Sequence, residues 1–289
     1  MIQSAAPTHE RTTAWHHDQL GIPALWDAGV TGAGARVALL DSGLARVRGL
    51  DRPGTEYLDA RGKSTTPNDA QTGHGTRCAS IVGSTADRAL GLAPDAAIVS
   101  FQVTAFGDAV LNLERALAAV VRRGDIDVVL CAFSIPSLPL RVVDQISALA
   151  ASGVILVAAA GSSDHAMAFP ETARQAIAVA GITRNQLALP LARRGDFIDI
   201  AAPGEDLPAL NPLEQIVPFG DSSAAAAVVA GVAALLMSTR TRPQRRELGA
   251  RFQDVVIRTS KPLPGVSASA VGAGCVNPVG ILQLIHEGL

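Results

Sequence analysis

The sequence has little excess charge of either sign, and this absence limits the partners the protein can have. Its 289 residues carry a formal net charge of -2 at pH 7. Without a broad positive field, no surface is expected to hold nucleic acid or an anionic membrane by charge alone. We therefore expect no nucleic-acid or membrane partner, and a target recognised by shape and local chemistry.

Long hydrophobic runs are also missing. The longest apolar stretch, Ala224 to Met237, is shorter than the roughly 20 residues that a membrane-spanning helix needs. The N-terminus, MIQSAAPTHERTTAWHHDQL, has no basic segment followed by an apolar one, so it does not have the pattern of a secretory signal. These two absences predict a cytoplasmic protein.

Cysteine is scarce, with only Cys78, Cys131 and Cys275 in the chain. The three are widely spaced, odd in number and form no C-x-x-C pair, which argues against a disulfide framework and against a structural zinc site. We expect all three cysteines to be reduced and buried.

What the sequence does have is a regular alternation of short apolar runs with longer helix-compatible segments. Six runs are typical of buried strands: 35–41, 96–103, 127–133, 153–160, 176–182 and 197–202. Three segments have helical spacing: 109–123, 139–151 and 224–239. This rhythm predicts a parallel sheet with helices on both faces. The length suits one large α/β domain, with two small domains as the alternative, and no shift in composition marks a boundary.

Segments rich in glycine, proline, aspartate or asparagine predict loops at 49–57, 64–75 and 203–215. Towards the C-terminus, 241–258 has the pattern of a surface helix with one apolar side, and 277–289 that of a short closing helix.

Polar residues follow apolar runs at three places, where the functional crevice of an open α/β sheet is expected. Asp41 ends a strand, His74 stands between two glycines, and Asp221, Ser222 and Ser223 precede an apolar helix. Each has a structural interpretation on its own: a turn former, a hydrogen-bonded histidine, and helix N-cap residues. Together they supply an orienting carboxylate, a general base and a nucleophile.

The segments around these residues resemble the subtilisin-like serine proteases. VALLDSG is similar to the aspartate motif of that family, HGTRCASIVG to its histidine motif, and AGVAALL to the helix after its serine. The likeness runs from about Trp15 almost to the C-terminus, which divides the chain into an N-terminal extension, 1–14, and a peptidase domain, 15–289. It implies an α/β fold of three layers, with a mostly parallel central sheet and helices on both faces.

The resemblance implies that Asp41 orients His74 and that His74 activates Ser223. The serine motif of the family places its nucleophile eight residues before a glycine, here Gly231, which selects Ser223 and puts Ser222 in a threonine position. In the alternative register Ser222 is the nucleophile, but one inserted residue would then rotate the buried face of the helix by about 100°.

The resemblance also implies an oxyanion hole made by Ser162 and the backbone N–H of Ser223. Ser162 stands where the family has asparagine, a donor whose loss costs about 10²–10³ in rate in subtilisin itself. Asp221 stands where the family has glycine. It could cap the helix, or it could oppose the negative charge that develops on the substrate if it faces the cleft.

For substrate binding, the resemblance implies that Ala132, Phe133 and Ser134 form the edge that pairs with a peptide, a recurring mode of peptide recognition. Ser134 replaces a glycine and is expected to narrow the first specificity pocket, whose opposite wall contains Gly161. The segment after His74 is shorter than the calcium-binding loop of the family, so we expect no metal ion and no other cofactor.

These features predict a serine endopeptidase that acts through an acyl-enzyme, with selective processing of a bacterial peptide precursor as its role. The resemblance begins almost at the N-terminus, which leaves no room for a propeptide, so folding proceeds unaided or an inhibitor is a separate chain. The expected partner is a peptide or protein substrate. The alternative is an impaired family member that binds a peptide or partner protein without cleaving it. Transpeptidation also stays open, because the sequence does not distinguish it from hydrolysis.

Overall fold

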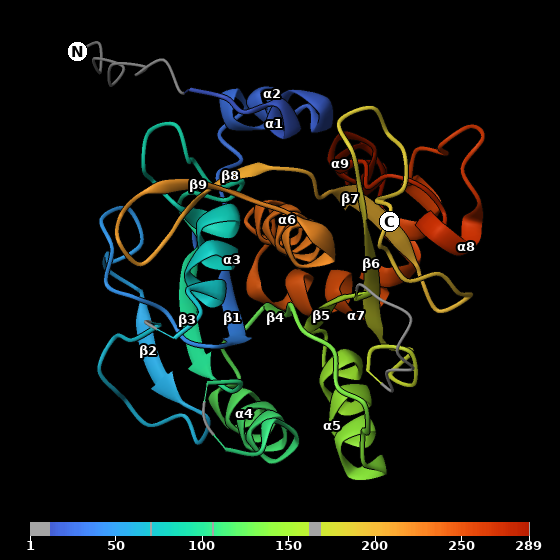
Figure 1. Cartoon of the computed structure of the whole chain (residues 1–289). Coiled ribbons are helices and arrows are strands. Elements are labelled where there is room, and N and C mark those ends of the chain that lie inside the picture. Colours follow the sequence, from blue (N-terminus) through green and yellow to red (C-terminus); the bar gives the residue numbers. More distant parts are fainter. Residues whose placement is uncertain (1–11, 70, 106, 162–168, 289) are drawn as a thin grey trace.

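A parallel sheet of seven strands forms the centre of the molecule (Figure 1). The computed structural model describes residues 12–69, 71–105, 107–161 and 169–288. The strands lie in the order β2-β3-β1-β4-β5-β6-β7, and every neighbouring pair in this sheet is parallel. A separate antiparallel hairpin, β8-β9, precedes the helix with the two serines.

The strands are β1 (Arg36–Asp41), β2 (Glu56–Asp59), β3 (Ala97–Gln102), β4 (Val128–Cys131), β5 (Ile155–Ala159), β6 (Ala176–Ile182), β7 (Ile200–Pro203), β8 (Leu207–Leu210) and β9 (Ile216–Phe219). The helices are α1 (Trp15–Leu20), α2 (Ile22–Asp27), α3 (His74–Gly83), α4 (Ala109–Arg123), α5 (Leu140–Ala151), α6 (Asp221–Met237), α7 (Arg242–Thr259), α8 (Ala268–Val271) and α9 (Pro278–His286).

The sheet is apolar on both faces, because successive side chains of a strand point to opposite sides. In β1, Val37 and Leu39 belong to the core shared with α3, α6, α7 and α9, whereas Ala38 and Leu40 belong to the core beneath α4 and α5. Figure 1 shows α4 and α5 together on one side of the sheet and α3 and α6 on the other. The predicted three-layer α/β fold is therefore confirmed.

Helix α6 lies inside the molecule. Every residue from Ala224 to Met237 is fully buried, and the helix packs against α3 and against strands β4 to β7. Small side chains allow this close approach. A Cβ atom at Gly231 would lie 2.9 Å from the Cβ of Leu92, so even alanine there would crowd its neighbour. Polar residues remain only at the N-terminal end, which reaches the carboxyl edge of the sheet.

The structure changes several predicted boundaries. The predicted loops at 49–57 and 203–215 run into β2 and contain β8, respectively, because short strands with glycine and proline beside them resemble loops in sequence. The predicted strand 127–133 ends at Cys131, and α6 begins at Asp221, three residues before the predicted start. The three cysteines are free and buried, as expected.

No helix in the described ranges is both long and apolar enough to cross a lipid bilayer.

At the amino-terminal end, helices α1 and α2 were not predicted. They carry a buried pair of histidines whose ring centroids lie 4.1 Å apart, His16 and His17. Burial lowers the pKa of both imidazoles, that of His17 to about 4, because the charged form would lose its hydration.

Acid is therefore expected to destabilise the protein through this pair. The folded state holds His17 neutral with a pKa of about 4, and the unfolded chain binds the proton near pH 6.5. Its contribution to the free energy of unfolding is complete above pH 6.5 and falls by about 3 kcal/mol as the pH drops to 4. Urea unfolding across this range checks it. His17→Gln should show a shallower loss, whereas a change at the exposed His286, His286→Gln, should follow the wild type. Equal slopes in all three proteins would contradict the assignment.

Candidate active site

The polar residues singled out in the sequence meet at the carboxyl ends of the central strands. Asp41 is the last residue of β1, and His74 is the first residue of α3. Ser222 and Ser223 lie in the first turn of α6. These segments are far apart along the chain, and the parallel sheet with its covering helices brings them to one edge.

Asp41 and His74 form a hydrogen-bonded pair. The distance from His74 Nδ1 to Asp41 Oδ1 is 2.8 Å. Asp41 is almost completely buried, and its Oδ1 also accepts the backbone N–H of Ser42. These bonds hold the carboxylate in place. Because Nδ1 of the imidazole is bonded to Asp41, the other ring nitrogen, Nε2, is left to bond another group.

Two glycines beside His74 let α3 begin where it does. Gly73 caps the helix in the left-handed conformation, with φ of 65°. At Gly75, a Cβ atom would lie 2.1 Å from the carbonyl oxygen of Gly43. Any other residue at position 75 would therefore keep the helix further from the backbone that follows Asp41. This close contact fixes the distance between β1 and α3, and with it the position of His74.

A buried network behind the pair was not predicted from the sequence. The Ser42 hydroxyl donates to Asp69 Oδ1 at 2.6 Å and accepts the N–H of Gly75. The other carboxylate oxygen of Asp69 accepts both the N–H and the hydroxyl of Thr76, each at 2.7 Å. Asp69 lies in a segment predicted as a loop, and nothing in its local sequence distinguishes it from a turn residue. The network ties that loop to β1 and α3.

Charge and burial act on His74 in opposite directions. A thiolate at Cys78, whose Sγ lies 3.8 Å from His74 Nδ1, and the carboxylate of Asp41 would each raise the pKa of the imidazole, while burial lowers it. With the thiolate and the carboxylate both charged, the net direction is upward. Burial also raises the pKa of the Cys78 thiol to about 11, so this thiol is neutral at pH 7 and Asp41 is then the charge that acts on His74.

Phe219 covers the imidazole of His74. Their ring centroids are 5.5 Å apart at an interplanar angle of 84°, an edge-on contact. The guanidinium of Arg77 lies over the ring of Phe219, 5.3 Å from its centroid. Phe219 precedes the double serine by three positions, yet the sequence offered no sign that it would reach the histidine.

The two serines make different contacts. Ser222 is buried, and its hydroxyl accepts the backbone N–H of Gly161 at 3.1 Å. The hydroxyl of the partly exposed Ser223 donates to the carbonyl oxygen of Ala132 at 3.0 Å. Within the described ranges, no hydrogen bond joins Ser223 to His74. The aspartate–histidine contact is therefore formed in this conformation, and a histidine–serine contact is not.

Asp221 is held in an unusual backbone conformation. Its φ is 72°, in the left-handed region that favours glycine and tolerates aspartate and asparagine. Gly220 is the N-cap of α6, so Asp221 does not cap the helix in the way its sequence position indicated. Its carboxylate accepts the N–H of the next residue, Ser222, at 2.7 Å. A side-chain acceptor for that N–H explains why an aspartate suits this turn.

The segments expected to bind substrate lie beside the serines. Ala132, Phe133 and Ser134 follow β4, and Gly161 follows β5, its neighbour in the sheet. Gly161 has φ of 92°, which a side chain would strain. Ser162, the expected oxyanion donor, lies outside the described residues.

One group of side chains in the described ranges has ligand atoms close enough to share a metal ion. Atoms of Asp41, His74 and Cys78 all lie within 4.8 Å of one another. His74 Nδ1 is already bonded to Asp41, however, and the raised pKa of Cys78 keeps its sulfur protonated at neutral pH, where a metal would need the thiolate. The donor set fits the aspartate–histidine pair better than it fits a metal.

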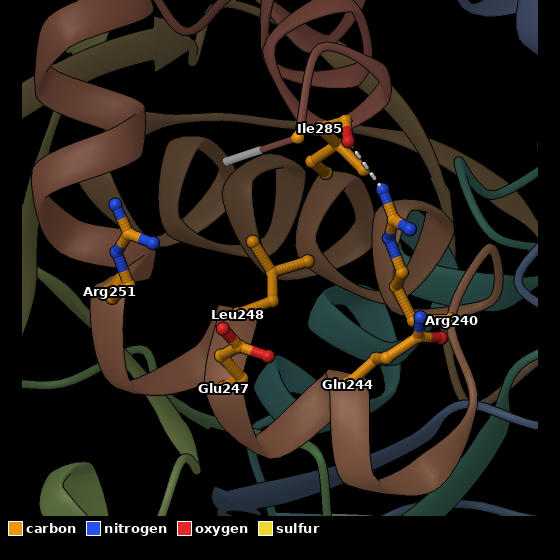
Figure 2. Close-up of a pocket in the computed structure, with 7 residues that line it drawn as sticks. Arg240, Gln244, Glu247, Leu248, Arg251 and Ile285 are labelled. Carbon is orange, nitrogen blue, oxygen red and sulfur yellow. Dashed lines mark hydrogen bonds between the residues drawn. The ribbon is translucent and has the colours of Figure 1, made fainter.

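A separate pocket of about 190 Å³ lies between α7 and α9 (Figure 2). Its wall includes Arg240, Leu248 and Ile285, and none of Asp41, His74 and Ser223 lines it. Figure 2 shows the guanidinium of Arg240 directed at the carbonyl oxygen of Ile285, to which it donates at 2.7 Å. This arginine thereby ties α9 to the end of α6.

The turn at Asp221 predicts how substitutions there affect stability. Asp221→Ala removes the acceptor for the Ser222 N–H, and alanine tolerates a positive φ less well than aspartate, so we expect a loss of about 1–2 kcal/mol in the free energy of unfolding. Asp221→Asn keeps a side-chain acceptor and also tolerates a positive φ, so it is the matched control, with little expected change. Urea unfolding measures both. Equal losses in the two variants would show that the turn does not depend on the side-chain acceptor.

Comparison with known proteins finds proteases among the relatives of this chain. M-protease of Shouchella clausii (strain KSM-K16) is 27% identical over 235 residues, which cover 79% of this chain and 60% of the relative. Subtilisin BL of Lederbergia lenta is 26% identical over 232 residues, or 78% of this chain and 84% of the relative. The chain thus spans 60% of the length of the first curated relatives that it matches.

Solved structures agree on the fold. MycP1 with its N-terminal propeptide removed has a TM-score of 0.78 and 23% identity, covering 94% of this chain and 97% of MycP1. The prenylagaramide maturation protease PagA has a TM-score of 0.75 and 21% identity, covering 91% and 97%. At these identities the likeness shows the fold alone. The sequence model of the subtilase family, Peptidase S8, matches residues 32–274, and the chain therefore belongs to the subtilase family.

Proposed function

We propose that this chain is a serine endopeptidase that cleaves peptide bonds through an acyl-enzyme. The observation that carries the proposal is the hydrogen bond between buried Asp41 and His74, beside the helix terminus that presents Ser223. Membership of the subtilase family supports the same reaction class. Asp41 orients His74, His74 is the general base, and Ser223 is the nucleophile.

The reaction requires the Ser223 hydroxyl to exchange its hydrogen-bond partner. The Ser223 hydroxyl leaves the carbonyl oxygen of Ala132 and turns to His74 Nε2. His74 takes the hydroxyl proton as Ser223 Oγ bonds to the carbonyl carbon of the substrate. His74 then gives this proton to the leaving amine as the peptide C–N bond breaks. A water molecule attacks the resulting ester by the same route, which releases the acid and restores the serine.

Ser223 suits the role of nucleophile better than Ser222. The hydroxyl of Ser222 is buried and accepts the N–H of Gly161, which ties the first turn of α6 to the end of β5. Using it as a nucleophile would break this tie. Ser223 is partly exposed and faces the segment after β4, where an extended peptide would lie. The arrangement supports the register in which Ser222 takes a structural position.

Negative charge on the attacked carbonyl oxygen would be stabilised at the N-terminus of α6. The N–H of Ser223 belongs to the first turn of this helix, whose N–H groups and dipole favour an anion. We propose Ser162 as the second donor. The carboxylate of Asp221 lies in the same turn, but its bond to Ser222 N–H satisfies part of its charge locally.

The biological role we propose is selective processing of a peptide precursor rather than bulk digestion. One structurally similar protein, PagA, is described as a maturation protease, which is consistent with this role. A second candidate function is binding of a peptide or partner protein without cleavage. It is favoured by the contact of Ser223 with Ala132 instead of His74. It predicts that the Ser223 hydroxyl never reacts with a bound peptide.

An active-site probe distinguishes these functions and identifies the serine. A fluorophosphonate should label the wild-type protein and Ser222→Ala but not Ser223→Ala, because the probe bonds only to a serine activated by His74. Intact-protein mass spectrometry measures the labelling, and circular dichroism confirms that both variants fold. Label lost only from Ser222→Ala would make Ser222 the nucleophile. Absence of label on all folded proteins would favour binding without cleavage.

The raised pKa of His74 predicts an alkaline pH dependence. Neutral imidazole is the base, so the labelling rate should be low when His74 is protonated and should rise as the pH passes through its pKa. Because the charge and hydrogen bond of Asp41 raise that pKa, the midpoint of the rate increase should lie above pH 6.5. The rate of probe hydrolysis in buffer at each pH is the control. A midpoint at or below pH 6.5 would show that the charge of Asp41 does not outweigh burial.

A further inference from the structure

Two chain segments bound the space next to the proposed nucleophile. The segment after β4 contacts Ser223 through the carbonyl oxygen of Ala132, and the segment after β5 contacts Ser222 through the N–H of Gly161. Strands β4 and β5 are neighbours, with Cys131 paired to Ala158, so the two segments leave the sheet side by side. A peptide whose carbonyl carbon lies at Ser223 Oγ would place the side chain of that residue between them.

Two side chains of the protein lie against Gly161 at the edge of this space. A Cβ atom built on Gly161 would lie 2.7 Å from the hydroxyl oxygen of Ser134 and 3.1 Å from Cδ of Arg193. Both distances are shorter than ordinary van der Waals contact, so the two side chains converge on the α-carbon of Gly161. A gap between the segments wide enough for a large side chain would require Ser134, Arg193 or both to move away.

Arg193 is held too firmly to move away easily. Its guanidinium donates to Glu171 at 2.7 Å and to the carbonyl oxygen of Ala160 at 3.4 Å, and it stacks on the ring of Phe197 with its Cζ 4.6 Å from the centroid. Only 9% of the side chain is exposed. Because Glu171 balances its charge, the guanidinium is poorly suited to receive an acidic side chain of a substrate. Its methylene groups act as a wall.

Of the two side chains against Gly161, Ser134 is the one that can move more easily. It lies in the segment between β4 and α5, is partly exposed, and presents a single hydroxyl group to Gly161. Two hydrogen bonds hold the backbone of Gly161 in place: its N–H donates to the Ser222 hydroxyl at 3.1 Å, and its carbonyl oxygen accepts the N–H of Arg193 at 3.2 Å. Among the described residues, one hydroxymethyl group and one immobilised arginine stem therefore limit the size of a side chain in front of Gly161.

We propose that Ser134 and Arg193 close the pocket for the residue that contributes the attacked carbonyl, so that the enzyme cleaves after glycine or alanine. The inference rests on the proposed endopeptidase function and names its substrate class: peptides with a small residue on the N-terminal side of the cleaved bond. Larger side chains collide with the Ser134 hydroxyl. Single methylene-sized changes in such pockets alter kcat/KM by about 10–200-fold, so discrimination of at least tenfold against leucine and phenylalanine follows.

The experiment uses the full chain and a mixture of peptides from a digested proteome, with cleavage sites identified by mass spectrometry. Wild type should cleave after glycine and alanine. Ser134→Gly removes the hydroxymethyl group and should raise cleavage after leucine and phenylalanine at least tenfold. The matched control is Ser137→Gly, an exposed serine of the same segment, which should keep the wild-type pattern. Arg193→Ala provides a second opening of the same pocket if Ser134→Gly does not fold.

The possible failures are distinguishable. Wild-type cleavage mainly after leucine, phenylalanine or other large residues would overturn the pocket closure and leave the endopeptidase function standing. The same is true if a folded Ser134→Gly or Arg193→Ala variant keeps the wild-type pattern. Fluorophosphonate labelling of each protein is measured in parallel. If no folded protein is labelled and none cleaves any peptide, the proposed function fails, and this inference fails with it.

Discussion

The burial of helix α6 is the constraint on which the rest of the structure depends. A helix that is apolar on every side cannot lie on a surface, so the sheet, α3 and the C-terminal helices must enclose it. Alanine and glycine make this possible because neighbouring backbones can approach without large side chains between them. The polar first turn must then emerge at the carboxyl edge of the sheet. Ser222 and Ser223 reach the site because the apolar remainder of their helix is buried in the core.

The same close packing positions the histidine. Gly75 lets α3 approach the backbone that follows Asp41, and the Ser42–Asp69–Thr76 network supports this contact with buried hydrogen bonds. Buried polar networks of this kind are rigid when every member has a partner. The aspartate–histidine pair lies on the end of a central strand and on the start of a helix, and Asp69 of the segment before α3 links the two.

In contrast, the serine side of the site is arranged in a closed form. The Ser223 hydroxyl is bonded to the carbonyl oxygen of Ala132, in the segment proposed to bind a peptide, and Ser134 and Arg193 lie against Gly161. Both features concern the same small region between the ends of β4 and β5. In the proposed function, a substrate competes for the carbonyl of Ala132 and enters a narrow gap, which supports the proposal of selective processing over bulk digestion.

The sequence by itself determined the fold class and the identity of the chemical groups. Apolar runs of strand length and the scarcity of cysteine are local signals, so the parallel sheet and the buried cysteines were predictable. The boundaries of β2 and β8 were not, because their few residues resemble loops until a partner strand is present. Only the tertiary structure decided which side chains meet: Asp69 behind Asp41, Phe219 on His74, and Arg193 against Gly161. These contacts join residues whose separation along the chain carries no periodic signal, and they exist only because burial of α6 brings the carboxyl ends of the strands to one place.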